Sequence, residues 1–341
     1  MTVAPVDSSP VVAGAVELGL PVLGSLSPSR AGDFMTCPLL FRFRTIDRLP
    51  QAPSSAATRG TVVHAVLERL FDLPAPERTP AAATALLRPE WERLLEAEPQ
   101  VGTLFADEVE LSTWLTSAEE LLQGYFTLED PTRLQPAERE AYVEVVLPGG
   151  LRLRGIVDRL DVAPSGDVRV VDYKTGRAPR EAFEGKALFQ MKFYALVLWR
   201  TRGTIPRLLQ LMYLGDREIL RYSPDESDLL AVERKLVALW QAIEKATQLR
   251  DFRPRRSKLC DWCDHQALCP EFGGTPPPFP AAVPGPDELL PHQVEAALRA
   301  AAQQQAAGAS SAPGPAAVPR APIQAPPGPA GFRADSPTVD V

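Results

Sequence analysis

Two aspartates and a lysine are expected to lie close together in one hairpin. Asp158 is part of the apolar run 155–162, and Asp172 and Lys174 end the run 168–174, which follows a turn-forming Ala-Pro-Ser-Gly-Asp segment. A hairpin that is symmetric about Ser165 places Asp158 directly opposite Asp172. Facing Cβ atoms of antiparallel strands are about 4.5–5.5 Å apart. Two carboxylates separated by ~5 Å repel each other by roughly 3 kcal/mol at an effective dielectric constant of about 20.

A divalent cation between the two carboxylates would turn this repulsion into ligation, and Mg²⁺ suits oxygen ligands that leave several of its waters in place. Lys174 lies two residues beyond Asp172, so its side chain leaves the strand on the same side. Carboxylates and an ammonium group around a hydrated cation outline a site for phosphodiester hydrolysis. The alternative is a surface hairpin in which Lys174 only pairs with an aspartate. Asp161, an odd number of residues from Asp158, is expected to face away from the cation.

The four cysteines of the chain have a spacing typical of a metal or cluster site. Cys260, Cys263 and Cys269 follow the pattern C-x2-C-x5-C, and Cys37 lies far upstream. Four thiolates bind either zinc or an iron-sulfur cluster, and His265 is an alternative fourth ligand to zinc. Long chains without a secretory signal generally keep their cysteines reduced, which favours a cytoplasmic protein.

The periodicity of apolar residues predicts helices, then a compact group of strands, then helices again. This order indicates an α+β or α/β fold with a mixed sheet. The expected helices are 58–71, 86–98, 108–126, 183–200 and 225–249, and the expected strands are 142–147, 151–162, 168–174 and 208–214.

Composition divides the chain into three parts. Residues 1–24 form a flexible arm, residues 25–274 one globular domain, and residues 275–341 a disordered Pro/Ala-rich tail that contains 15 of the 36 prolines and one short helix near 286–305. The net charge of −7 argues against indiscriminate binding to polyanions. Two local basic patches stand out, one at 42–48 and one at 250–258. No run of roughly 20 apolar residues is present, so no membrane span is expected.

Several segments together resemble the RecB-like exonuclease branch of the PD-(D/E)XK nuclease superfamily, and its iron-sulfur subgroup in particular. They cover about 26–271 in the order expected for that branch. The matching segments are Leu26-Ser-Pro-Ser to Cys37-Pro38, Arg59-Gly60-Thr-Val-Val-His64, Asp158, Asp172-Tyr-Lys174-Thr-Gly176, Gln190-Met-Lys-Phe-Tyr194 and the three C-terminal cysteines.

The resemblance implies a restriction-endonuclease-like α/β core, in which a mixed central sheet is flanked by helices, with a helical insertion and a C-terminal iron-sulfur segment. It implies that Mg²⁺ or Mn²⁺ is bound by His64, Asp158, Asp172 and the backbone carbonyl of Tyr173. It assigns the catalytic lysine to Lys174, and Gln190 and Tyr194 to the lining of the site and to DNA binding. It implies a [4Fe-4S] cluster on Cys37, Cys260, Cys263 and Cys269, with Zn²⁺ as the alternative. The family often has an acidic residue on the preceding strand, where Glu144 lies; its role stays open.

The function implied by this resemblance is a metal-dependent DNA exonuclease of DNA repair or recombination. Its expected substrate is DNA with a single-stranded or free end, and a separate helicase is a possible partner, because the chain has no Gly-x-x-x-x-Gly-Lys-Ser/Thr loop for ATP hydrolysis. The alternative is a non-catalytic DNA-binding or scaffold subunit of a helicase-nuclease complex. The presence of His64, Asp158, Asp172 and Lys174 together favours the enzyme.

Overall fold

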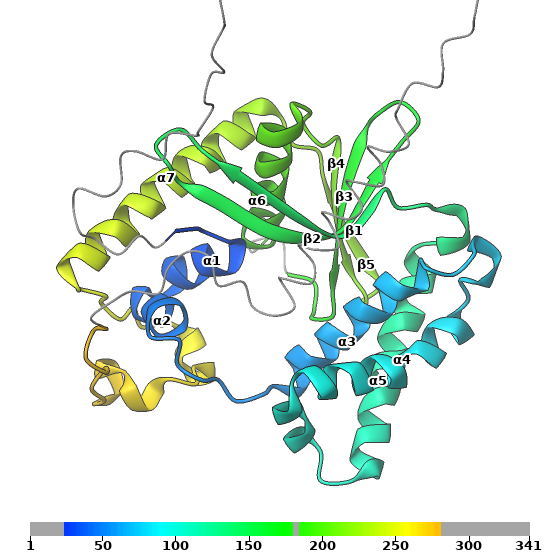
Figure 1. Cartoon of the computed structure of the whole chain (residues 1–341), viewed down its shortest axis with the longest axis horizontal. Helices are drawn as coiled ribbons and strands as arrows, with labels where there is room; N and C mark the ends of the chain where they lie inside the picture. Colours follow the sequence, from blue (N-terminus) through cyan, green and yellow to red (C-terminus); the bar gives the residue numbers. More distant parts are fainter. Residues whose placement is uncertain (1–23, 180–183, 281–341) are drawn as a thin grey trace, which may run out of the picture. The chain divides into compact units, whose positions relative to one another are not determined.

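A single mixed sheet organises the chain. The computed structural model describes residues 24–179 and 184–280 (Figure 1). The first three strands form an antiparallel meander, the third and fourth run parallel, and the fifth is antiparallel to the fourth. The strands, in their order in the sheet, are β1 (Glu138–Val146), β2 (Arg152–Val162), β3 (Val168–Lys174), β4 (Leu208–Tyr213) and β5 (Glu218–Tyr222).

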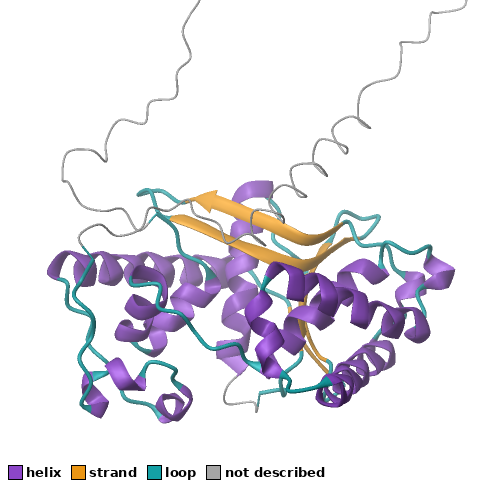
Figure 2. Cartoon of the chain, turned by 60° about the horizontal axis from the view of Figure 1, so that its bottom comes forward, coloured by secondary structure: helices purple, strands orange, loops and turns teal. Residues whose placement is uncertain are grey.

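Helices pack against both faces of the sheet, as Figure 2 shows. One apolar core joins the sheet to α3 (Ser55–Leu70), α4 (Pro80–Ala97) and α5 (Glu108–Leu128). The other joins it to α1 (Pro28–Thr36), α2 (Pro38–Phe41), α6 (Glu184–Arg202) and α7 (Glu226–Leu249). Neighbouring residues of β3 belong to different cores, since Val170 packs in the second and Val171 in the first. This is the predicted α/β class, with α6 as the crossover that a parallel strand pair requires.

Side-chain caps fix where the long helices begin. The Ser54 hydroxyl accepts a hydrogen bond from the N–H of Ala57 and starts α3. Asp107 accepts from two N–H groups at the start of α5. Asp225 and Asp228 form a capping box at the start of α7. Each cap satisfies N–H groups that have no partner within the helix.

The structure differs from the sequence expectations at several element boundaries. β1 begins at Glu138, four residues before the expected strand, because the charged segment Glu138-Arg-Glu140 shows no apolar alternation. β5 was not expected, since this short edge strand carries an exposed polar pattern. α4 begins at Pro80 rather than near residue 86, and Pro89 lies inside it. α1 and α2 were not predicted as helices; Pro28 and Pro38 occupy their first turns, where proline is tolerated.

The packed chain continues past the expected domain end at Gly274. The ring of Phe279 stacks on Phe252 at a centroid distance of 6.0 Å, and the Arg42 guanidinium lies 5.2 Å from the centroid of the Phe279 ring. The expected arm, apart from residue 24, and the expected helix near 286–305 lie outside the described residues. Among the described helices none is long and apolar enough to cross a membrane.

Short helical turns complete the described chain. They are the π-helical η1 (Arg42–Ile46) and the 3-10 turns η2 (Ala75–Glu77), η3 (Pro99–Leu104), η4 (Pro131–Arg133), η6 (Lys258–Trp262), η7 (Gln266–Leu268) and η8 (Pro270–Phe272).

Gly124 allows α5 to approach the chain that leaves β4. A Cβ atom built on Gly124 would lie 2.0 Å from the carbonyl oxygen of Leu214. We therefore expect Gly124→Ala to lower the free energy of unfolding by about 1–3 kcal/mol, because the helix must move away from the sheet. Gly32→Ala in α1 is the matched control, since a Cβ there meets no atom within 4 Å. Thermal denaturation measures both; equal stability of the two variants would contradict the close approach.

Candidate active site

The two aspartates predicted to face each other lie where β2 and β3 stop pairing. The ladder runs from Val162↔Val168 to Arg159↔Val171, which is the predicted register centred on Ser165. The next position in this register joins Asp158 to Asp172. Instead of a backbone pair, the Oδ2 atom of Asp158 accepts a hydrogen bond of 2.7 Å from the N–H of Tyr173. The site thus forms where the sheet opens between β2 and β3.

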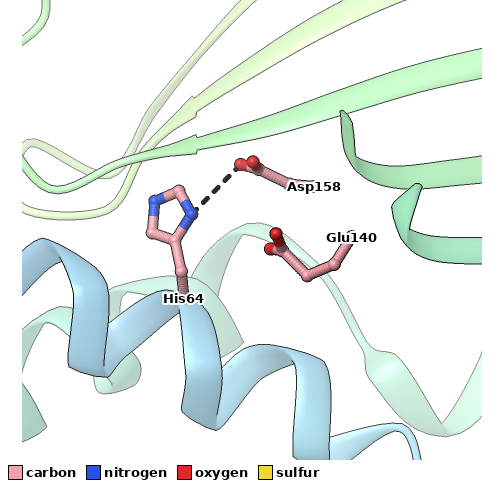
Figure 3. A group of neighbouring side chains, drawn as sticks. All are labelled: His64, Glu140 and Asp158. Atoms are coloured by element: carbon pink, nitrogen blue, oxygen red, sulfur yellow. Dashed lines mark ion pairs between the residues drawn. The ribbon is translucent and has the colours of Figure 1, made fainter. Parts of the chain in front are cut away.

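His64 reaches this opening from α3. Its Nδ1 atom lies 3.4 Å from Oδ2 of Asp158 (Figure 3). Gly60, one helical turn earlier, lets α3 approach the end of β3, since a Cβ there would lie 3.2 Å from the Thr175 hydroxyl oxygen. The spacing between Gly60 and His64 therefore has a physical cause. Gly60 allows α3 to lie close to β3, and His64, one turn later on the same face of the helix, points into the site.

Glu140 is the third member of this cluster and was missed by the sequence analysis. One ligand atom from each of His64, Glu140 and Asp158 lies within 4.8 Å of the others, and Figure 3 shows the three side chains converging. In the β1–β2 register Glu140 stands opposite Asp158, between the pairs Arg139↔Arg159 and Ala141↔Val157. The sequence did contain a signal for Glu140. If the β1–β2 hairpin is taken as symmetric about the turn residue Gly149, as the next hairpin was about Ser165, Glu140 falls opposite Asp158.

The backbone at Glu140 is strained. Its φ angle is 43°, in the left-handed region that non-glycine residues rarely adopt. Such a conformation costs on the order of 1–3 kcal/mol and persists where its surroundings determine it, often at functional sites. The strain breaks the regular course of β1 at the residue whose carboxylate joins the cluster.

Two other acidic residues of these strands lie outside the cluster. Glu144, whose role the sequence left open, accepts a hydrogen bond of 2.6 Å from the Tyr142 hydroxyl. Asp161 pairs with Arg159 and Arg169 instead, as its odd spacing from Asp158 suggested.

Lys174 begins a chain of polar contacts that leads from β3 to α6. Its Nζ atom lies 2.7 Å from Oδ2 of Asp172 and donates a hydrogen bond of 2.9 Å to Oε1 of Gln190. The Gln190 amide donates in turn to the Tyr194 hydroxyl at 3.2 Å. Gly155 provides the space for that ring, because a Cβ there would lie 2.6 Å from its Cε1 atom. The structure thus brings together four residues that the sequence analysis named.

Buried like charges dominate the electrostatics of the site. Burial, and then the Asp158 carboxylate, raise the pKa of Asp172 to about 6 and that of Glu140 to about 8. Burial alone would lower the pKa of His64, but the adjacent Asp158 raises it to about 9. Burial also disfavours the charge of Asp158, yet His64 and the N–H of Tyr173 hold the pKa of that carboxyl below its usual value. At neutral pH the cluster therefore retains protons that a cation would displace.

These observations fit a divalent cation. The cluster offers carboxylate oxygens and an imidazole nitrogen, and Asp172 is 2% exposed with its Oδ2 atom in no hydrogen bond of good geometry. Oxygen-rich sets of this kind suit Mg²⁺ or Mn²⁺. Asp172 is not one of the three mutually closest groups, because its carboxylate is turned toward Lys174.

A buried ion network of Arg159 and Glu129 supports β3 through the side chain of Tyr173. The Arg159 side chain is 1% exposed and donates hydrogen bonds of 2.7 Å to the Tyr173 hydroxyl and 2.6 Å to Glu129. Tyr173 in turn presents its backbone N–H to Asp158. A charged residue inside an apolar strand was the only sequence signal of this support. It fixes the main chain between Asp172 and Lys174.

The four cysteines line one small cavity of about 50 Å³, although Cys37 is distant from the others in sequence. The N–H of Arg255 donates to Sγ of Cys37 and the N–H of Ser257 to Sγ of Cys260, both at 3.3 Å. Burial, and to a lesser degree the three other sulfur atoms, raise the pKa of Cys269. Converging thiols with N–H donors are a donor set that fits a metal or an iron-sulfur cluster.

His265 and Trp262 do not contribute to this cavity. His265 is 4% exposed, packs edge-on against Phe43 and is not among the described residues that line the cavity. Trp262 is 84% exposed and is therefore not a packing residue.

Comparisons with known proteins agree with this geometry. The sequence model of the PD-(D/E)XK nuclease superfamily matches residues 25–270. The chain is 24% identical over 274 residues to the Gene 69 protein of Mycobacterium phage D29, covering 72% of this chain and 96% of that protein. It is 30% identical over 126 residues to the Gene 69 protein of Mycobacterium phage L5, covering 36% and 41% of the two chains.

Among solved structures, a protein of Eubacterium rectale described as a "Putative exonuclease" superposes with a TM-score of 0.49 and 13% identity. The match covers 71% of this chain and 88% of that one. At this level of similarity the structure adds no argument about function.

Glu140 and Glu144 form a matched pair for testing the cluster. We expect Glu140→Gln to weaken Mn²⁺ binding at least about tenfold, because it replaces a charged ligand. Glu144→Gln, on the same strand, is expected to bind Mn²⁺ like the unaltered protein, since its carboxylate is held by Tyr142. Isothermal titration calorimetry measures both. If Glu140→Gln binds Mn²⁺ as tightly as Glu144→Gln, Glu140 is not a ligand.

Proposed function

This chain belongs to the PD-(D/E)XK nuclease superfamily, and from that premise we propose that it is a Mg²⁺- or Mn²⁺-dependent exonuclease that hydrolyses phosphodiester bonds in DNA. One observation carries the proposal: His64, Glu140 and Asp158 converge beside Asp172, and Lys174 is held next to them by an ion pair and a hydrogen bond.

Each side chain of the site has a role in this proposal. His64, Glu140, Asp158 and Asp172, together with the backbone carbonyl of Tyr173, would hold the cation. When bound, the cation would polarise the phosphate and supply an activated water for in-line attack. The Lys174 ammonium, oriented by Asp172 and Gln190, would stabilise the negative charge that develops on the phosphate oxygens. Gln190 and Tyr194 would position the DNA backbone beside it.

The preference for DNA with a single-stranded or free end, and a place in DNA repair or recombination beside a separate helicase, rest on the resemblance to RecB-like exonucleases. The scaffold alternative is less well supported. A scaffold subunit would have no need to maintain Lys174 within 2.7 Å of a carboxylate that is 2% exposed.

We further propose that the four cysteines bind a [4Fe-4S] cluster rather than Zn²⁺. The choice of the cluster over zinc rests on the resemblance to the iron-sulfur subgroup. The convergence of Cys37 with the three C-terminal cysteines on one cavity supports a shared occupant, and the apolar lining by Leu39, Leu40 and Phe43 would shield it from water.

Lys174 provides the direct test of the enzyme. We expect Lys174→Ala to reduce cleavage of linear single-stranded DNA by about 10²–10³-fold, because a group that stabilises the transition state is lost. The matched control is Lys245→Ala, which removes an exposed lysine on α7. Labelled linear and circular strands are incubated with Mg²⁺, Mn²⁺ or a chelator. Cleavage without a metal, or full activity of Lys174→Ala, would overturn the mechanism, and cleavage of circles would overturn the exonuclease assignment.

Cys37 tests the cluster. We expect anaerobically purified Cys37→Ala to contain less iron and to melt at a lower temperature, because the cluster joins two segments that are far apart in the chain. Elemental analysis and thermal denaturation measure these effects. Zinc in place of iron in the unaltered protein would contradict the cluster, and unchanged iron content and melting temperature would contradict the role of Cys37.

A further inference from the structure

A large cleft of about 1690 Å³ adjoins the site on the side of α1 and α6. Gln190 and Tyr194 line it, and Gln190 also contacts Lys174, so the cleft and the site share a wall. The cleft is formed by segments from distant parts of the sequence, namely α1, η1 and the chain after it, β1, β2, α6, α7 and the start of η6. Several of them belong to none of the motifs considered above.

The lining of the cleft is strongly basic, although the chain as a whole has a net charge of −7. Asp33 is the one acidic residue among the described lining residues, and it is paired with Arg44 at 2.9 Å. The two basic patches noted in the sequence meet here, because Arg44 and Arg48 come from the first and Lys258 from the second. The basic lining residues are Arg30, Arg44, Arg48, Arg154, Lys235 and Lys258.

Three of these arginines, Arg30, Arg48 and Arg154, come from separate segments and line the same cleft. Arg154 on β2 is 7% exposed, and Arg30 on α1 donates hydrogen bonds only to neutral oxygens of Ser25 among the contacts described. Burial, and then the charges of Arg154 and Arg48, lower the pKa of Arg30 to about 10. The three side chains line the same cleft, so a phosphate in it could accept charge-assisted hydrogen bonds from more than one guanidinium group.

The carboxylate nearest to Arg154 in the β1–β2 register makes its described contacts with other residues. Glu144 stands opposite Arg154, but its Oε2 atom accepts a hydrogen bond from the Tyr142 hydroxyl and its Oε1 atom lies 3.9 Å from Arg152. The aromatic rings of Tyr142, Phe189 and Tyr194 lie along the same cleft. A basic groove interleaved with aromatic rings is typical of sites that bind a single nucleic acid strand.

We propose that Arg30, Arg48 and Arg154 form a phosphate-binding subsite that holds a backbone phosphate of a single-stranded substrate farther along the strand from the one being cleaved. This inference rests on the proposed function, because it identifies the substrate of the same site as one strand. Arg154 and Asp158 are four residues apart on β2, which corresponds to about 13 Å along a strand. Consecutive phosphates of a strand are closer together than this, so the phosphate in the subsite lies beyond the immediate neighbour of the reacting phosphate, and it fixes the strand along the cleft toward Gln190.

Binding measurements test the subsite without cleavage. Lys174→Ala protein with Mg²⁺ is titrated with a labelled single-stranded oligonucleotide at several salt concentrations. Adding Arg30→Gln or Arg154→Gln is expected to weaken binding by about 10- to 100-fold, as expected for loss of a charge-assisted hydrogen bond. The slope of log K against log salt should fall by about 0.7 for each lost phosphate contact. Arg30→Lys, which keeps the charge, should restore part of the affinity.

The control is Arg207→Gln, because Arg207 is an exposed arginine outside the cleft. It is expected to bind and to cleave as the unaltered protein does. Thermal denaturation checks that each variant folds. If the Arg154→Gln variant does not fold, the binding test is made with Arg30→Gln and Arg48→Gln alone.

A second probe locates the contact. Oligonucleotides with one methylphosphonate, which removes a single phosphate charge, are tested position by position. At one position the methylphosphonate should weaken binding to the Lys174→Ala protein. The same methylphosphonate should have a smaller effect when Arg30→Gln is also present, since the two changes remove the same contact.

Parent-like affinity and salt slope in all arginine variants would overturn the subsite, and so would tighter binding of duplex than of single strands. Strand binding without any cleavage by the unaltered protein would overturn the proposed enzyme and leave the subsite standing. Failure of the protein to bind any strand would overturn both.

Discussion

The candidate active site is organised around carboxylates that are buried together and repel one another. Asp158 and Asp172 lie next to each other at the opening between β2 and β3, with Glu140 on the neighbouring strand. The protein offsets part of this repulsion with three positive or polar groups: His64, Lys174 and the N–H of Tyr173. Burial still raises the pKa of Asp172 and of Glu140. Glu140, with its pKa raised to about 8, retains a proton at neutral pH that a bound cation would displace.

The fold maintains this arrangement from two sides. Gly60 lets α3 approach β3 closely enough for His64 to reach Asp158. On the other side, Gly155 makes room for Tyr194, which continues the polar chain from Lys174. The buried pair of Arg159 and Glu129 holds the main chain of β3 between them. Both glycines therefore act by allowing close approach, not by adopting unusual backbone angles.

Distant parts of the chain meet at two places outside the catalytic cluster. The cysteine cavity joins Cys37 to the segment that follows α7. The basic cleft gathers Arg30 and Arg48 near the beginning of the domain with Arg154 from the sheet and Lys258 near its end. The negative net charge of the chain would keep nucleic acid away from most of its surface, so the proposed subsite in the basic cleft would direct a strand to one place. In the proposed function, binding and hydrolysis would thus be combined without a generally basic protein.

The sequence by itself determined the parts of the site that depend on local periodicity. Turn symmetry about Ser165 specified the β2–β3 register, and the spacing of Asp172, Lys174, Gln190 and Tyr194 specified which side chains share a face. Only the tertiary structure decided that Glu140, on an irregular stretch of β1, completes the cluster, and that Arg30, Arg48 and Arg154 line one cleft. Periodicity relates residues within a strand, hairpin or helix, whereas contacts between elements depend on how the whole chain packs.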